Sequence, residues 1–126
     1  MSESGSPHAR FRRALATKNL LLIRAAAAEL PQINLDDALL VCVALRDGEP
    51  ARYDAAAVRW IARFCAEQPD VTLEEVDLAC SAFEEMRLDA EQGLTTLQAL
   101  VAWGNQRLRV GRSGGASASG ATAQQM

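Results

Sequence analysis

The segment ALLVCVAL at residues 38–45 decides the fold, because all eight residues are apolar and an element of this kind must be buried on every side. A run of this length fits a buried strand as well as a buried helix. Asn34 before it is a typical helix N-cap, and two acidic residues suit the first turn that follows. The pair Asp47-Gly48 favours a helix end, and no second strand offers itself for pairing. We therefore predict a helix over residues 35–47 at the centre of the core.

Helices are also predicted on both sides of this segment, which gives an all-α fold: a single compact bundle of about five helices. Pro31 ends the first helix, since the residue before a proline avoids helical geometry. Thr72 begins the fourth helix with the capping-box pattern Thr-Leu-Glu-Glu, and a loop through Gly93 precedes the last helix. The first helix is expected over residues 11–29 or 17–29, with a kink or break near residues 17–19 left open. The third helix is expected over residues 50–68 and the last over residues 94–108.

Apolar residues at the helical period predict the buried side of each helix. On the central helix, the line of Leu39, Cys42 and Leu45 is expected to be the most buried. The predicted buried stripes of the other helices are Tyr53, Ala57, Trp60, Ile61, Phe64 and Cys65 on the third, Leu73, Val76, Ala79, Cys80, Phe83 and Met86 on the fourth, and Leu97, Leu100, Val101, Gly104 and Leu108 on the last.

Both ends of the chain are poor in large apolar residues and are predicted to be disordered. We expect a basic tail at residues 1–10, a helical bundle domain at 11–110 and a Gly-, Ser- and Ala-rich tail at 111–126. The chain has 13 lysines and arginines against 16 aspartates and glutamates, a balance that does not by itself suggest a nucleic-acid binder. No stretch is long and apolar enough to span a bilayer, so we expect no membrane partner and a cytoplasmic location.

The residues needed for common catalytic and cofactor sites are missing from the sequence. The single histidine, His8, lies in the N-terminal tail, which argues against Cys-His or Ser-His catalysis. Three cysteines form neither a disulfide framework nor a zinc pattern, and we expect them to be reduced and buried. No phosphate-binding glycine motif and no Glu-x-x-His metal motif occurs. We therefore predict that the protein is not an enzyme and has no cofactor and no metal.

Acidic residues gather on the outer side of the fourth helix and favour a protein partner. Such a surface attracts basic partners and repels DNA, although a merely solvated face is the plainer alternative. A tryptophan at the edge of the last apolar stripe is the type of residue that anchors interfaces, and an arginine follows it one turn later. The candidate partner-binding residues are Glu74, Glu75, Glu84, Glu85, Trp103 and Arg107. They predict a non-enzymatic interaction module whose partner is another protein or a second copy.

Two alternatives remain open from the sequence. Arg52, Arg59 and Arg63 share one side of the third helix and are candidate phosphate contacts, so the chain could be a small DNA-associated regulator that uses this face or its basic ends. A ligand carrier with a pocket between helices is the third alternative, and it ranks last because the predicted core contains almost no polar groups.

The segments RALATKNLLLIRAAAAELPQINLDDAL at residues 13–39 and AAVRWIARF at residues 56–64 resemble a group of uncharacterised small helical proteins from high-GC Gram-positive bacteria. The resemblance covers less than half of the chain and implies an all-helical fold. It carries over no activity and no functional residue.

Overall fold

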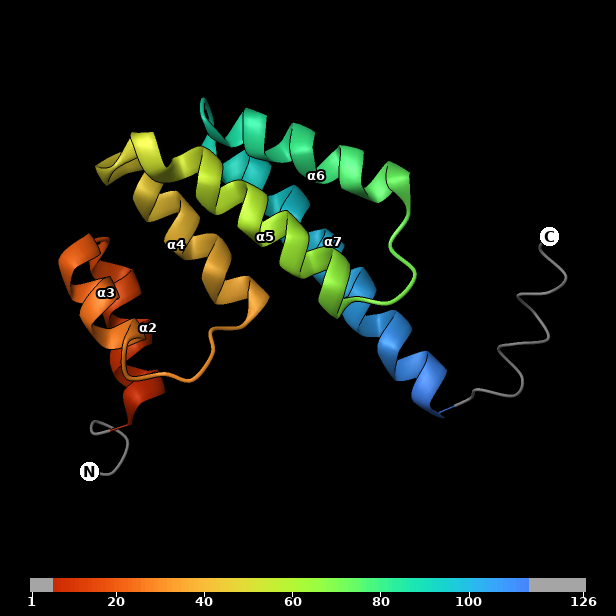
Figure 1. Cartoon of the computed structure of the whole chain (residues 1–126), viewed down its shortest axis with the longest axis horizontal. Helices are drawn as coiled ribbons and strands as arrows, with labels where there is room; N and C mark the ends of the chain where they lie inside the picture. Colours follow the sequence, from red (N-terminus) through yellow and green to blue (C-terminus); the bar gives the residue numbers. More distant parts are fainter. Residues whose placement is uncertain (1–5, 114–126) are drawn as a thin grey trace, which may run out of the picture.

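A computed structural model describes residues 6–113 of the chain, and these residues contain six α-helices, one short 3₁₀ helix and no strand (Figure 1). The all-α prediction is confirmed, with six helices in place of about five. The parts of the predicted tails at residues 1–5 and 114–126 lie outside the described residues. The helices are α2 (Pro7–Thr17), α3 (Leu20–Ala27), α4 (Leu35–Gly48), η1 (Pro50–Arg52), α5 (Tyr53–Glu67), α6 (Leu73–Met86) and α7 (Ala90–Ser113).

The extra helix arises because the first predicted helix is broken in two. Lys18 has a left-handed backbone with φ 58°, which ends α2, and the Asn19 side chain then accepts hydrogen bonds from two backbone N–H groups and caps α3. Helix α2 also begins earlier than predicted, because Ser6 accepts a hydrogen bond from the Ala9 N–H and Pro7 suits the first helical position. Residues 7–10 are therefore helical and do not belong to a disordered tail.

Helix α4 lies between the α2–α3 pair on one side and α5 and α7 on the other (Figure 1). Ala44 belongs to a small cluster with Phe11 and Ile23, while the line Leu39, Cys42 and Leu45 belongs to the main core. The Asn34 side chain caps the helix by accepting a hydrogen bond from the Asp37 N–H at 2.8 Å. The central position predicted for residues 38–45 is confirmed, since neighbours on two sides require an apolar surface all round.

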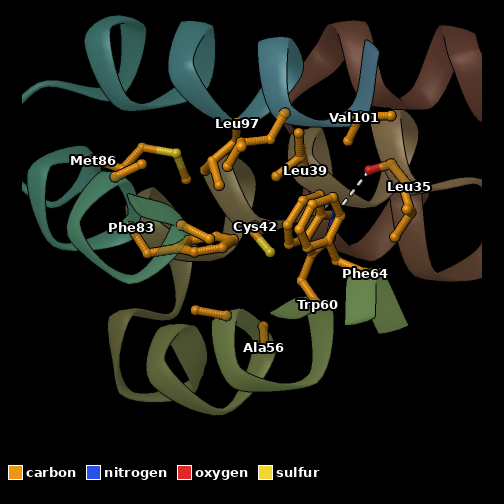
Figure 2. Packing of buried hydrophobic residues seen from close by; sticks show 14 of the residues in the cluster. Leu35, Leu39, Cys42, Ala56, Trp60, Phe64, Phe83, Met86, Leu97 and Val101 are labelled. Carbon is orange, nitrogen blue, oxygen red and sulfur yellow. Dashed lines mark hydrogen bonds between the residues drawn. The ribbon is translucent and has the colours of Figure 1, made fainter. Parts of the chain in front are cut away.

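Aromatic rings from α5 and α6, among them Trp60, Phe64 and Phe83, fill the main core beside α4 (Figure 2). The rings of Trp60 and Phe64 stack with centroids 5.3 Å apart, and Phe83 from α6 meets Trp60 edge to face at 5.6 Å. The indole Nε1 of Trp60 donates a hydrogen bond of 2.9 Å to the Leu35 carbonyl oxygen. This packing fixes α5 against both α4 and α6.

Helix α7 is longer than predicted at both ends, and Gly93 lies within it and not in a loop. A Cβ atom at Gly93 would lie 2.4 Å from the carbonyl oxygen of Ala82, so the absence of a side chain lets α7 begin directly against α6. At the other end, residues 111–113 continue the helix, where we had predicted a disordered tail.

The buried stripe of α6 is rotated from the predicted one. The buried residues are Ala79, Ala82, Phe83 and Met86, whereas Leu73 and Cys80 are exposed. Because α7 packs on the side of Ala82 and Met86, the centre of the stripe moves away from Leu73 and Cys80. Cys65 on α5 is also exposed, so the prediction of three buried thiols is correct only for Cys42, although all three are free.

No helix within residues 6–113 combines the length and the apolar composition that crossing a bilayer requires.

Candidate functional site

The capping box predicted at the start of α6 is present and orients its first turn. The Thr72 hydroxyl accepts a hydrogen bond from the Glu75 N–H at 3.1 Å, and the Glu75 carboxylate accepts one from the Thr72 N–H at 3.0 Å. This reciprocal arrangement turns the Glu75 side chain back over the helix end and leaves the neighbouring Glu74 facing solvent.

Two of the candidate partner-binding residues, Glu75 and Arg107, bind each other. Arg107 Nη1 lies 2.9 Å from Glu75 Oε2, and the glutamate side chain is only 15% exposed. Burial acts to raise the pKa of Glu75, but the hydrogen bonds from Thr72 and Arg107 outweigh it, so the pKa is lowered from its ordinary value. The pair holds the C-terminal half of α7 to the start of α6.

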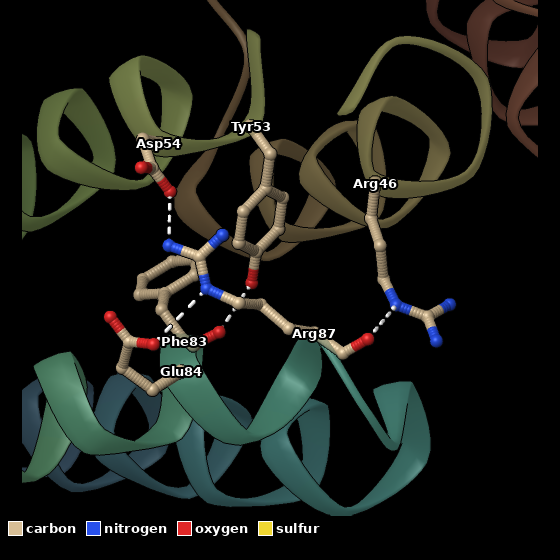
Figure 3. Close-up of polar contacts among 6 residues, drawn as sticks. All are labelled: Arg46, Tyr53, Asp54, Phe83, Glu84 and Arg87. Atoms are coloured by element: carbon tan, nitrogen blue, oxygen red, sulfur yellow. Dashed lines mark hydrogen bonds and ion pairs between the residues drawn. The ribbon is translucent and has the colours of Figure 1, made fainter. Parts of the chain in front are cut away.

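A third candidate, Glu84, also forms an ion pair with another residue of the same chain (Figure 3). Arg87 Nε donates a hydrogen bond to Glu84 Oε1 at 3.1 Å, and its guanidinium also pairs with Asp54 on α5. The same group lies over the Tyr53 ring, 5.4 Å from its centroid. The hydrogen bonds to Glu84 and Asp54 raise the pKa of Arg87. The positive charge of Arg87 neutralises these two carboxylates near the C-terminal end of α6.

The remaining acidic residues of α6 face solvent and have no counter-ion in the part of the chain that the structure describes. Glu74, Asp77 and Glu85 are exposed, and no ion pair among residues 6–113 includes any of them. Leu78 on α6, which was not among the candidates, is 40% exposed, and Trp103 on α7 is 52% exposed. The candidates Glu74, Glu85 and Trp103 are therefore available for contact with another molecule.

The helical positions place these exposed residues on one side of the α6–α7 pair. The contacts of Glu75 with Arg107 and of Ala82 with Gly93 show that the two helices run antiparallel. Leu78 lies one turn after Glu75 on α6, and Trp103 lies one turn before Arg107 on α7. Because the helices are antiparallel, Leu78 and Trp103 are displaced from the Glu75–Arg107 ion pair in the same direction along the helix axes. Glu74, Leu78 and Glu85 share a helical face at i, i+4 and i+11. We call Glu74, Leu78, Glu85 and Trp103 the α6–α7 surface.

The structure brings the three candidate phosphate contacts together only in part. Arg52 in η1 pairs with Glu49 at 3.2 Å, whereas Arg63 pairs with Glu67 at 2.8 Å and donates a second hydrogen bond to a backbone carbonyl. Arg59 forms no hydrogen bond and no ion pair within the part of the chain that the structure describes. Within residues 6–113, Arg59 alone of these three arginines thus keeps an unneutralised charge.

No group of three or more His, Cys, Asp or Glu side chains that could hold a metal ion occurs among residues 6–113.

Comparison with models of protein families, with curated proteins and with solved structures finds no match to this chain, so any account of its function depends on the surfaces described above.

Proposed function

We propose that the protein is a non-enzymatic helical interaction module that binds a basic protein partner through the α6–α7 surface. The observation that carries this proposal is the half-exposed indole of Trp103 on the same side as carboxylates that have no counter-ion within the described residues. Tryptophan is enriched among the residues that dominate binding energy, because one ring buries a large apolar area at little entropic cost.

The charge of the surface supports a basic partner. Glu74 and Glu85 are free carboxylates on either side of Leu78, and Asp77 adds a third one nearby on α6. Free carboxylates around an apolar contact speed the encounter with a positively charged surface and disfavour acidic partners. An apolar centre with a charged rim is also the usual anatomy of a protein interface.

A nucleic-acid function is less well supported by the arginines of η1 and α5. Several unneutralised cations are needed to replace the counter-ions of a phosphate backbone. Arg52 and Arg63 already pair with Glu49 and Glu67, which leaves Arg59 alone on this face.

The proposal is tested by comparing what the full chain and its variants retain from a native lysate of the source cells, with quantitative mass spectrometry. The informative variants are Trp103→Ala and the charge reversal Glu74→Lys with Glu85→Lys. Leu21→Ala is the matched control, since Leu21 is 75% exposed but lies on α3. We expect a basic partner whose recovery falls about tenfold or more with Trp103→Ala and with the charge reversal, and stays unchanged with Leu21→Ala.

Circular dichroism melting of each variant separates lost binding from lost folding. Light scattering of the full chain shows whether the partner is a second copy, in which case Trp103→Ala shifts the molecular mass toward the monomer. Recovery of the same proteins by all three variants contradicts the proposal. So does a monomeric wild type that retains nothing above the empty resin.

A further inference from the structure

An apolar groove of about 470 Å³ runs along α4 where α5 packs beside it. Its floor and walls are formed by Ala38, Val41 and Leu45 on α4 and by Ala56 and Trp60 on α5. Leu45 and Trp60 are buried, while Ala38 and Val41 are half-buried, so the groove opens to solvent over a lining of the main core. A volume of this size is typical of pockets that take small molecules.

Two arginines line this apolar groove, and they differ in their partners. Arg63 is held by Glu67 and by the carbonyl oxygen of Ile33, each at 2.8 Å, so its charge is already neutralised. Arg59 has no carboxylate partner among residues 6–113. The positive charge of Arg59 acts on the Cys42 thiol in the groove and lowers its pKa. Burial has the larger, opposite effect and raises that pKa to about 11.

We propose that this groove binds a linear aliphatic carboxylate, with the hydrocarbon chain along Val41 and Leu45 and the carboxylate on the guanidinium of Arg59. The apolar lining gains from removing methylene groups from water, and the Arg59 guanidinium, which has no carboxylate partner among residues 6–113, selects an anionic head group. Both features are needed, because neither a purely apolar nor a purely polar ligand matches a groove of this composition.

This site is separate from the surface proposed for the protein partner. It lies on α4 and α5 and shares no residue with the α6–α7 surface. Ligand binding in the groove is therefore independent of partner binding at Trp103, and either proposal can fail without the other.

The experiment is isothermal titration calorimetry of the full chain with decanoate, below the concentration at which it forms micelles. We expect saturable binding that weakens about fourfold for each methylene removed along the series to hexanoate, in line with the free energy of burying one methylene. Decanol and decyltrimethylammonium carry the same chain without the negative charge, and we expect both to bind more weakly than decanoate. The emission of Trp60, measured in a Trp103→Phe background in which it is the remaining indole, should change with the same affinity.

Two variants locate the site. Arg59→Gln should weaken decanoate binding about tenfold or more, while Arg59→Lys should restore part of it. Arg52→Gln is the matched control, since Arg52 is exposed and pairs with Glu49 outside the groove, and it should leave the affinity unchanged. Ala38→Leu, which fills the groove, should abolish binding, with its fold checked by circular dichroism.

Three results would each overturn the proposal: no saturable binding of decanoate, an affinity that does not depend on chain length, or equal affinities of the wild type and Arg59→Gln. Because Arg59 is exposed and its replacement does not touch the core, a failure of Ala38→Leu to fold leaves the Arg59 test intact.

Discussion

The indole of Trp60 donates its N–H to the carbonyl oxygen of Leu35 at 2.9 Å, and this single bond joins the middle of α5 to the first turn of α4. Both residues are buried, so the indole would otherwise leave an unsatisfied donor in the core. The bond sets the position of α5 along α4. It thereby shapes the groove between them and directs the Trp60 ring toward Phe83.

Replacement of Phe83 tests this aromatic core. The ring is 4% exposed and contacts both Tyr53 and Trp60, so Phe83→Ala should lower the free energy of unfolding by about 3–5 kcal/mol. Arg59→Ala on the exposed side of α5 should cost less than about 0.5 kcal/mol. Urea denaturation of both variants measures the difference, and similar losses would show that the buried and exposed sides of these helices are wrongly assigned.

Alanine substitutions at helical glycines test how closely the helices approach one another. At Gly93 the added Cβ meets the backbone oxygen of Ala82, which cannot move unless α6 and α7 separate, so Gly93→Ala should cost about 1–3 kcal/mol. At Gly48 the nearest atom is the flexible Cδ1 of Leu20 at 2.8 Å, and Gly48→Ala should stay within about 0.5 kcal/mol of the wild type. Thermal melts that rank the two variants in the opposite order would contradict this packing.

The ion pair between Glu75 and Arg107 predicts a pH dependence of stability. The pKa of Glu75 is lower in the folded chain than in the unfolded chain, so its stabilising contribution is present above roughly pH 4.3 and is lost as the pH falls through the folded pKa. Glu75→Gln should therefore destabilise the protein at neutral pH, and its difference from the wild type should shrink toward about pH 3.

Denaturant titrations across this range measure that difference. Asp77→Asn is the control, because Asp77 is exposed on the same helix and forms no ion pair within residues 6–113. A Glu75→Gln effect that is constant with pH would mean that the charge of Glu75 does not contribute.

The three thiols should react at different rates with a disulfide reagent. Cys65 and Cys80 are exposed and should be modified quickly in the native protein. Cys42 is buried, and burial raises its pKa to about 11, so little thiolate forms and its modification should wait for unfolding. Mass spectrometry of partially labelled protein identifies the sites, and rapid labelling at Cys42 would contradict its position in the core.

Local signals in the sequence predicted the starts of α4 and α6 correctly, whereas α2 and α7 begin earlier than predicted. Asn34 and Thr72 are capping residues whose side chains act on their own backbone, so their effect can be inferred without knowing the tertiary structure. The central place of α4 was also predictable, because a segment that is apolar all round has to be enclosed. The break at Lys18 was less predictable from the sequence. Lys18 adopts a left-handed backbone although it is not a glycine, so the only local signal for the break was Asn19 as a cap for the next helix.

The exposed surfaces depend on how the helices cross, which a single sequence does not specify. Leu73 was predicted to be buried and is instead 88% exposed, because α7 packs on the side of Ala82 and Met86. Glu75 was predicted on the outer side of its helix and Arg107 one turn after Trp103, both as partner-binding residues, but the two pair with each other across 32 positions of the chain. The groove between α4 and α5 likewise follows from packing and was not predicted.

The groove and the α6–α7 surface are both positioned by a core built around residues 38–45 of α4. Hydrogen–deuterium exchange of the native protein, followed by mass spectrometry of overlapping peptides, measures the protection of this core. We expect amides in this segment to exchange more slowly than those of α2, α3 and the α5–α6 connection. Exchange that is fastest in residues 38–45 would contradict this expectation.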